Sequence, residues 1–281
     1  MGETTLIRPF LKWPGGKYRL LPVLQEFLPP RNCLVEPFAG AGALFINSMH
    51  REVIVNDINP DLINLFRLLQ TQGDDFIIDA KKLFVHKNNH KQSYYRLRER
   101  FNSIQTPWER ALLFLYLNRH GYNGLCRYNA KGIYNVPFGD YVKPYFPLDE
   151  LHYFKQRAKQ VTFHCQDFVD FLTPFLKYPK RKMQQITFYC DPPYAPLSAT
   201  ANFTGYAQQH FSLNHQQQLA DLAHALAKKG ATVLISNHNT PFTREIYRHA
   251  ICTLLEVRRS ISCKTKARNK VSELIACFSA S

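Results

Sequence analysis

Short apolar runs alternate with longer amphipathic stretches along the chain, and their order predicts an α/β fold. Residues 33–36 and 53–55 are apolar enough for buried strands, and between them lie a glycine turn and the apolar start of a helix at 43–48. The same alternation returns after residue 147. Its strands are predicted at 161–163, 186–190, 232–236 and 253–257, with a helix at 213–228.

Between residues 60 and 147 the pattern changes to amphipathic helices. Apolar positions recur at helical spacing in four stretches, at 62–70, 74–83, 94–101 and 108–117. This segment holds 13 Lys and Arg against seven Asp and Glu. We therefore predict one α/β domain formed by residues 1–59 and 148–281, interrupted by a basic and mainly helical domain at 60–147.

The segment Asp191-Pro192-Pro193-Tyr194 directly follows the strand predicted at 186–190. Its carboxylate would lie at the carboxyl end of a strand, where open α/β sheets build their sites. The two prolines carry no N–H group, so the segment offers hydrogen-bond acceptors and a tyrosine ring. Acceptors beside an aromatic face suit a planar aromatic amine such as adenine. A proline turn in which Asp191 caps and Tyr194 packs is the structural alternative.

A nucleoside site is indicated by the turn at 37–42 and by Asp57 after the second strand. Strand, glycine turn, helix, strand and acid follow one another as in a nucleotide-binding βαβ unit, whose acid binds the ribose hydroxyls. Gly40 and Gly42 lack the third glycine of a pyrophosphate-binding turn. A nucleoside without phosphates, such as S-adenosylmethionine, therefore fits better.

A Pro-Gly-Gly bend places Trp13 and Lys17 close together, and these side chains could hold the amino acid end of such a cofactor. Leu11 and Tyr18 stand where a Walker phosphate loop needs Gly and Ser or Thr, which excludes that motif. A plain surface turn is the alternative. Asp167, after the strand at 161–163, is expected near the adenine.

Charge and cysteine usage restrict the partners. With 36 Lys and Arg against 21 Asp and Glu, the 281-residue chain has a formal net charge of +15, which favours a polyanion such as nucleic acid. No apolar run approaches the ~20 residues of a membrane span, and the first residues do not resemble a signal peptide, so we expect a cytoplasmic protein. The seven cysteines are never spaced as C-x-x-C, which predicts reduced thiols and no zinc site.

A hairpin is predicted around residues 129–132, where Asn-Ala-Lys-Gly lies between two arms rich in aromatic residues. Side chains near it can read bases. Arg127 can bind guanine through two hydrogen bonds, and Asn123 can pair with a base edge. Tyr122 and Leu125 can enter a base stack. A structural hairpin with a buried aromatic face is the alternative.

Taken together, these segments resemble the bacterial Dam family of DNA adenine methyltransferases. The resemblance covers nearly the whole chain and is carried by residues 10–17, 35–38, 115–119, 121–129 and 191–204. It implies a Rossmann-like, S-adenosylmethionine-dependent methyltransferase sheet, with residues 60–147 as a target-recognition domain that carries the hairpin. It also implies that the adenine amino group of double-stranded GATC is methylated after base flipping. We expect a monomer that uses no metal and binds no membrane.

The resemblance and the residue chemistry together assign roles to individual residues. The catalytic segment would be Asp191, Pro192, Pro193 and Tyr194. The cofactor would contact Trp13, Lys17, Phe38, Gly40, Gly42, Asp57, Asp167 and Asp191. The DNA would contact Lys12, Arg119, Tyr122, Asn123, Leu125, Arg127, Asn129, Asn135, Pro137, Tyr141, Ser198, Thr200, Arg258 and Arg259.

Within that set the resemblance gives Lys12 and Arg127 the first guanine and lets Tyr122 insert into the duplex. Pro137 and Tyr141 match positions that read the outer base pair. The polar loop at 195–206 is expected to close over the substrate. Residues 258–270 hold six basic residues and no acid, which favours phosphate contact.

The chain departs from the family pattern at two positions. His120 stands where a tyrosine is familiar, and Asp140 stands where the family can have an arginine beside the DNA. Two alternative functions are a methyltransferase for RNA or free bases, which the hairpin argues against, and a non-catalytic DNA-binding regulator, in which the cofactor or catalytic motif would be broken. Roles in DNA replication and mismatch repair are what the family resemblance permits.

Overall fold

The structure is a computed structural model that describes residues 6–197, 211–257 and 271–280. Four residues predicted to contact DNA lie outside these ranges, namely Ser198, Thr200, Arg258 and Arg259. Most of the predicted substrate loop and the basic run at 258–270 also lie outside the described residues.

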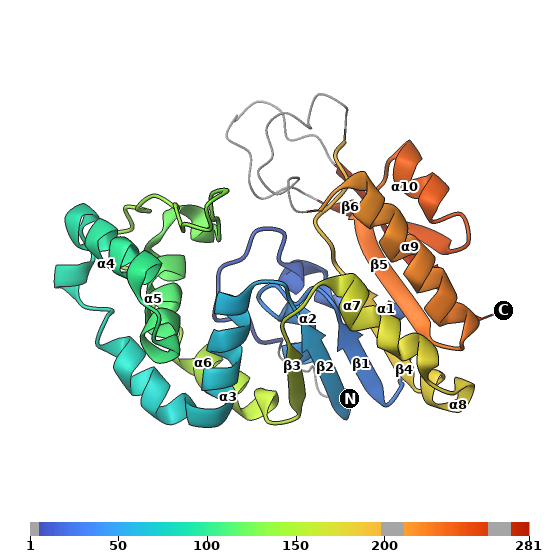
Figure 1. Ribbon diagram of the computed structural model, residues 1–281, viewed down its shortest axis with the longest axis horizontal. Coiled ribbons are helices and arrows are strands. Elements are labelled where there is room, and N and C mark those ends of the chain that lie inside the picture. Colours follow the sequence, from blue (N-terminus) through green and yellow to red (C-terminus); the bar gives the residue numbers. More distant parts are fainter. Residues whose placement is uncertain (1–5, 198–210, 258–270, 281) are drawn as a thin grey trace. The chain divides into compact units, whose positions relative to one another are not determined.

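In the described part of the chain, seven strands form one sheet in the order β3-β2-β1-β4-β5-β7-β6 (Figure 1). The strands are β1 (Cys33–Glu36), β2 (Glu52–Asn56), β3 (Val161–His164), β4 (Ile186–Cys190), β5 (Thr232–His238), β6 (Ile251–Val257) and β7 (Val271–Phe278). β1 pairs in parallel with β2 and β4, β4 pairs in parallel with β5, and β7 runs antiparallel between β5 and β6. This topology is the predicted Rossmann-like α/β sheet, so the fold class is confirmed.

The helices predicted at 43–48, 62–70, 74–83, 94–101, 108–117 and 213–228 are present, and the structure adds several that were not predicted. The helices are η1 (Lys17–Leu20), α1 (Leu21–Phe27), α2 (Ala43–Asn47), α3 (Pro60–Lys81), η2 (His86–Asn88), α4 (Lys91–Ser103), α5 (Pro107–His120), η3 (Tyr122–Gly124), α6 (Leu148–Ala158), α7 (Phe168–Leu172), η4 (Thr173–Lys177), α8 (Lys180–Met183), α9 (Leu213–Lys228) and α10 (Pro241–Ile246). The stretches at 62–70 and 74–83 are one helix, α3, whose backbone departs from helical geometry at Gln72. In the described part of the chain, no helix has the length and apolar character needed to cross a membrane.

Internal contacts group the chain into two compact units. Unit 1 comprises Met1–Glu26, Ala39–Met49 and Asp57–Cys165. Unit 2 comprises Phe27–Phe38, His50–Asn56 and Gln166–Ser281. The predicted division into 1–59, 60–147 and 148–281 stays a prediction about function, since compactness groups residues by a different criterion.

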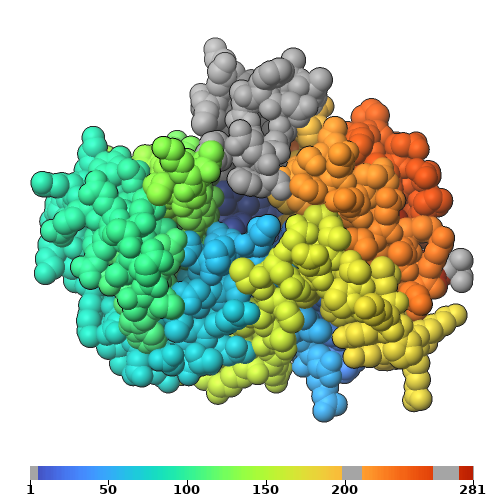
Figure 2. All heavy atoms as spheres, in the orientation of Figure 1, coloured from blue at the N-terminus to red at the C-terminus, as the bar shows by residue number. Residues whose placement is uncertain are grey.

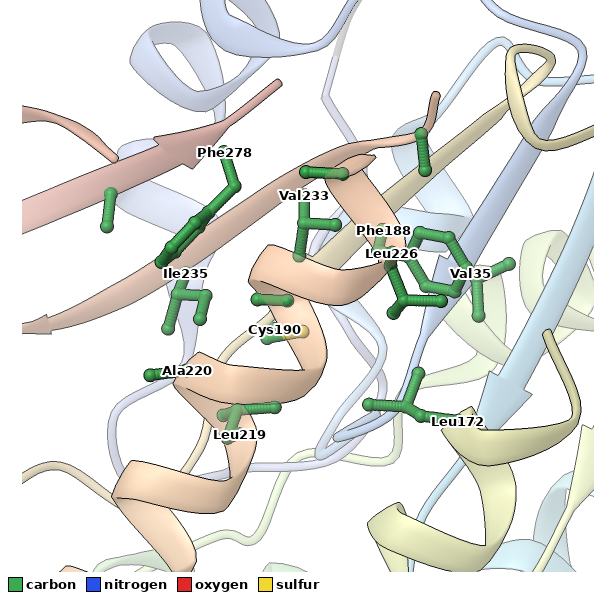
Figure 3. Packing of buried hydrophobic residues seen from close by; sticks show 14 of the residues in the cluster. Val35, Leu172, Phe188, Cys190, Leu219, Ala220, Leu226, Val233, Ile235 and Phe278 are labelled. Atoms are coloured by element: carbon green, nitrogen blue, oxygen red, sulfur yellow. The ribbon is translucent and has the colours of Figure 1, made fainter. Parts of the chain in front are cut away.

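The core of unit 2 explains why the predicted catalytic motif lies at a strand end. All five residues of β4 are buried, so the strand is covered on both faces. Helix α9 packs Leu219 and Leu226 against this sheet, beside Phe188 and Val233 (Figure 3). The apolar run ends at Cys190, and the next residue is Asp191, which is half-buried. The buried strand therefore fixes the backbone position from which the Asp191 side chain extends.

An aromatic core in unit 1 holds the N-terminal segment. The rings of Phe66 and Phe154 lie 4.8 Å apart, and Phe10 meets Phe154 edge to face at 5.0 Å. Phe45 and Phe163 complete the group. Phe10 is 1% exposed, so residues 10–13 leave the core in a defined direction and carry Lys12 and Trp13 with them.

Candidate active site and DNA-recognition residues

The catalytic segment follows β4 in unit 2. Asp191 and Tyr194 are half-buried, Pro192 is buried and Pro193 is exposed. The Tyr194 hydroxyl donates to Oε2 of Glu273 at 3.1 Å, and its ring meets the His238 ring edge to face at 4.9 Å. Burial, together with the nearby Asp191 carboxylate, raises the pKa of Tyr194. The tyrosine therefore stays protonated and presents an aromatic face.

Two buried amides fix the backbone on either side of Tyr194. Gln216 on α9 donates from Nε2 to the Pro193 carbonyl at 2.6 Å, and the Ala195 N–H donates to Oδ1 of Asn237 on β5 at 2.9 Å. The amides are themselves joined, because Nδ2 of Asn237 donates to Oε1 of Gln216 at 2.9 Å. Nδ2 also donates to the Tyr247 hydroxyl. Sequence reasoning missed this network, since nothing in the local sequence of either amide indicates it.

Part of the predicted nucleoside site is assembled within unit 1. Oδ2 of Asp57 accepts from the Gly40 N–H at 3.0 Å, and Oδ1 accepts from the Asn59 N–H at 2.9 Å. A Cβ built on Gly40 would lie 3.0 Å from Nε1 of Trp13, so the glycine turn packs against the indole. Burial raises the pKa of Asp57, while the two N–H donors act in the opposite direction. Each oxygen retains lone-pair capacity for a hydroxyl donor.

Two further residues of the set shape the same unit. Gly42 has a φ of 78°, and a Cβ there would lie 2.3 Å from the Phe45 ring, so only glycine fits. Lys17 is 8% exposed, and its ammonium donates to the Gly15 carbonyl at 2.6 Å. Lys17 thus stabilises the Pro-Gly-Gly bend that precedes it by a hydrogen bond to the backbone of the bend.

Phe38 and Asp167, also predicted to bind the cofactor, belong to unit 2. The Phe38 ring is half-buried and lies 5.5 Å from Phe168 and 5.6 Å from Phe211. Asp167 caps helix α7, because its Oδ1 accepts from the Val169 N–H at 2.8 Å. This bond uses one carboxylate oxygen.

Lys12 is held by its backbone and by an aromatic ring. Its N–H donates to Oδ1 of Asn118 at 2.9 Å, and its carbonyl accepts from Nδ2 of the same amide at 2.8 Å. The ammonium lies 3.8 Å from the centre of the Tyr141 ring, whose hydroxyl accepts from the Asn123 N–H at 2.9 Å. Burial and then the charge of Arg119 lower the pKa of Lys12 to about 8. Three of the predicted DNA-binding residues are thereby brought together.

Arg127 is exposed and oriented by Asn135. Its Nε donates to Oδ1 of Asn135 at 2.7 Å, and Nη2 donates to the Asn135 carbonyl at 3.2 Å. The backbones also pair, since the Asn135 N–H donates to the Arg127 carbonyl. Within the described residues, Nη1 makes no hydrogen bond, so the outer edge of the guanidinium faces outward with its donors available.

The predicted turn forms, although the arms make isolated bridges instead of continuous strands. Tyr128 and Tyr134 are an antiparallel bridge, and Oδ1 of Asn129 accepts from the N–H groups of Lys131 and Ile133 at 2.9 and 3.0 Å. Asn129 therefore shapes the turn. The stem is anchored to the start of α3, because the Tyr128 hydroxyl donates to the buried Asp61 at 2.6 Å.

Sequence reasoning also missed this anchor. Arg110 on α5 donates to both oxygens of Asp61, so one carboxylate joins α3, α5 and the hairpin stem. Asn59, two residues before Asp61, donates from Nδ2 to Sγ of Cys126 at 3.4 Å. The stem residues on either side of Arg127 are thus both tied to the start of α3.

The remaining predicted DNA contacts differ in exposure. Arg119 is only 9% exposed, and it donates to the carbonyls of Tyr145 at 3.1 Å and Phe10 at 3.4 Å. Tyr122 is 46% exposed, and its N–H donates to the carbonyl of Pro137, which is itself exposed. Leu125 is half-buried. Tyr122 and Pro137 are therefore available to a ligand, whereas Arg119 supports the backbone around Phe10.

The two departures from the family pattern have distinct surroundings. His120 is 1% exposed, its ring stacks on Tyr116 at 4.0 Å, and Nδ1 lies 2.9 Å from the Tyr116 carbonyl. Burial lowers the pKa of His120 to about 4, so it is neutral at pH 7. Asp140 is exposed and has a φ of 52°, a conformation that Asp and Asn tolerate better than most residues.

The six described cysteines are free thiols, two of them exposed. Cys190, next to the catalytic segment, is fully buried, and burial raises the pKa of its thiol. A buried, protonated thiol is a packing group.

Comparison with known proteins places these features in a family. Residues 13–261 match the family described as D12 class N6 adenine-specific DNA methyltransferase. The chain is 49% identical over 272 residues to a DNA adenine methylase of Serratia marcescens, which covers 96% of this chain and 98% of that protein. It is 49% identical over 271 residues to a DNA adenine methylase of Escherichia coli K12, covering 96% and 95%.

Proposed function

Because the chain belongs to the D12 class of N6 adenine-specific DNA methyltransferases, as a Dam-type member, we propose that it methylates adenine in double-stranded GATC. The methyl donor in this proposal is S-adenosylmethionine, and the target base is flipped out of the duplex. The observation that carries the proposal is the Asp-Pro-Pro-Tyr segment at the end of a buried strand, where Gln216 and Asn237 hold its backbone by hydrogen bonds.

The residues of the predicted nucleoside site fit this cofactor. Asp57, oriented by the Gly40 and Asn59 N–H groups, would accept from the ribose hydroxyls. Trp13, Lys17, Phe38, Gly42 and Asp167 would complete the site. When bound, S-adenosylmethionine supplies an electrophilic methyl group on a sulfonium. We assign no metal to the reaction.

The catalytic segment would work by accepting hydrogen bonds. The two N–H groups of the adenine amine would donate hydrogen bonds to the Asp191 carboxylate and the Pro192 carbonyl. These bonds favour a pyramidal nitrogen, whose lone pair is then no longer delocalised into the ring. As the C–N bond forms and the methyl–sulfur bond breaks, positive charge would develop on this nitrogen, and the fixed acceptors would stabilise it. Loss of one of the two N–H protons to water would then leave neutral methyladenine beside the neutral thioether. Tyr194, held by Glu273 and His238, stacks on the extruded base. Base extrusion costs a few kcal/mol.

Recognition is assigned to side chains of unit 1. Arg127, oriented by Asn135, and Lys12, beside Tyr141, would bind the first guanine. Tyr122 would enter the gap left by the flipped base, while Asn123, Leu125, Pro137 and Tyr141 would line the site. Asn129 and Arg119 would act by shaping the turn and supporting the backbone. We propose a monomer that works in the cytoplasm at the nucleoid.

Methyl transfer to two duplexes that differ only in one GATC tests this function. The modified base is identified by digestion and mass spectrometry. N6-methyladenine confined to the GATC duplex is expected. Methyladenine in both duplexes would keep the reaction and overturn the target, and no dependence on added S-adenosylmethionine would overturn the donor.

A further inference from the structure

Seven basic side chains gather in unit 2 at the amino ends of β1, β4 and β5. We call them the basic edge: Arg31, Lys177, Lys180, Arg181, Lys182, Lys228 and Lys229. All are exposed except Arg31, which is half-buried. None belongs to the sites assigned above.

Contacts bring the three segments together. Nη1 of Arg31 donates to the carbonyls of Gln184, just before β4, and Gly230, just before β5. A Cβ built on Gly230 would lie 3.6 Å from Cγ of Lys180. Since Lys228 and Lys229 directly precede Gly230 in sequence, the cations of α8 and of the end of α9 share one surface, at the lower right of Figure 1.

The segments that carry these cations are poor in acidic residues. The segments 27–35, 171–190 and 222–244 contain no Asp or Glu. Glu52, at the start of β2, is paired in register with Cys33 and is an acid beside this surface. Seven bases on segments that contain no acid give this surface a positive field, which favours a polyanion.

The basic edge and the catalytic segment lie at opposite ends of β4. The strand begins at Ile186, next to the basic edge, and ends at Cys190, next to Asp191. Five residues at ~3.3 Å each separate the two by roughly 16 Å along the strand. Figure 2 shows the segment of α8 (yellow, lower right) at the molecular surface. A base held at Asp191 therefore leaves these cations accessible.

We propose that the basic edge is a second DNA-contacting surface, which binds the phosphate backbone of a duplex segment other than the one whose adenine is methylated. The surface offers positive charge for phosphates and few side chains suited to base edges, so it binds DNA regardless of sequence. Among the described residues, no large apolar side chain of these three segments is strongly exposed. Apolar anchors characterise protein interfaces and membrane-binding faces, so their lack favours a phosphate backbone. Neighbouring segments of the same DNA are present whenever the enzyme is bound.

The test measures binding of a second duplex while the first remains bound. Protein is loaded with a short GATC duplex and S-adenosylhomocysteine, and a labelled duplex without GATC is then titrated by fluorescence anisotropy. The native protein is expected to bind both. The variant Lys180→Gln/Arg181→Gln/Lys182→Gln should bind the second duplex at least 10-fold more weakly. The slope of log affinity against log salt concentration should become shallower by up to about 3, because each lost phosphate contact contributes about 0.9. Its turnover on the short GATC duplex should equal that of the native protein.

A matched variant controls for net charge. Lys81, Lys91 and Lys159 are exposed cations outside the basic edge, and their replacement by Gln removes the same charge. Equal weakening in both triple variants, or none in the first, would overturn the proposal. Binding of anionic vesicles in place of the second duplex would assign the surface to a membrane instead. If turnover is absent on the GATC duplex yet the second-duplex result holds, the failure belongs to the proposed target and not to the basic edge.

Discussion

At Asp191 the direction of hydrogen bonding determines the expected chemistry. A carboxylate only accepts, whereas an amide of the same shape also donates. Asp191→Asn should therefore keep DNA affinity and lose about 10²-fold or more in single-turnover methyl transfer, the scale of removing one oriented polar group from a transition state. Transfer and binding are measured on the same duplex. Undiminished transfer would remove Asp191 from the mechanism.

Arg127 should contribute discrimination more than affinity. Asn135 orients its guanidinium, so truncation removes a prearranged donor pair and should cost roughly 1–3 kcal/mol at one guanine. Arg127→Ala is compared with Lys131→Ala, an exposed cation in the same turn, on duplexes with each base in turn at the first GATC position. The lysine variant should weaken binding on every sequence alike. If Arg127→Ala does the same, the arginine is a phosphate contact.

His120 should make the fold sensitive to acid. Its pKa is about 4 in the folded chain and about 6.5 when unfolded, so the unfolded state binds more protons between these values. The free energy of unfolding should fall as pH decreases from 6.5 towards 4, by about 2 kcal/mol between pH 7 and 5. His120→Tyr should flatten this part of the profile in urea unfolding at the two pH values. An unchanged profile would show that other groups cause the acid sensitivity.

Among the elements, β5 and α9 meet the catalytic segment through one amide pair. Asn237→Asp keeps the shape but loses the donor to Gln216 and Tyr247, and an unsatisfied buried group costs about 1–3 kcal/mol. We expect lower stability and lower kcat with little change in the KM for S-adenosylmethionine. Asn239→Asp, two residues along at a half-buried position, is the control and should keep kcat. Loss of stability with unchanged kcat would make Asn237 purely structural.

Local sequence predicts elements whose signal is local. Apolar runs correctly predict β1, β2 and β4, and helical spacing of apolar residues correctly predicts α4, α5 and α9. β7 was not predicted, because Ser272 and Glu273 interrupt its apolar run and its pairing partners are distant in sequence. The same holds within the site: Asp191 is evident from its motif, whereas Gln216 and Asn237 acquire their roles only when α9 and β5 pack together. The anchor at Asp61 likewise depends on tertiary contacts with Arg110 and Tyr128.

Over the whole molecule, the residues proposed for one reaction come from both compact units. Asp57 and Arg127 belong to unit 1, and Phe38 and Asp191 belong to unit 2. The chain passes repeatedly between units in its first 60 residues, so cofactor and catalytic residues cannot be divided at a single point in sequence. The pattern that marks 60–147 as basic and helical therefore predicts a functional division, and this division differs from the two compact units.

Net charge should control affinity without controlling target choice. A chain of charge +15 that neutralises 6–10 phosphates should lose about 10³- to 10⁵-fold in DNA affinity between 50 and 200 mM salt, because bound counterions are released. The hydrogen bonds that read bases release none, so the ratio of affinities for GATC and altered duplexes should stay nearly constant. Both constants are measured across that salt range. A ratio that collapses with salt would mean that discrimination also rests on phosphate contacts, and Arg127 and Lys12 would then act as charges and not as base readers.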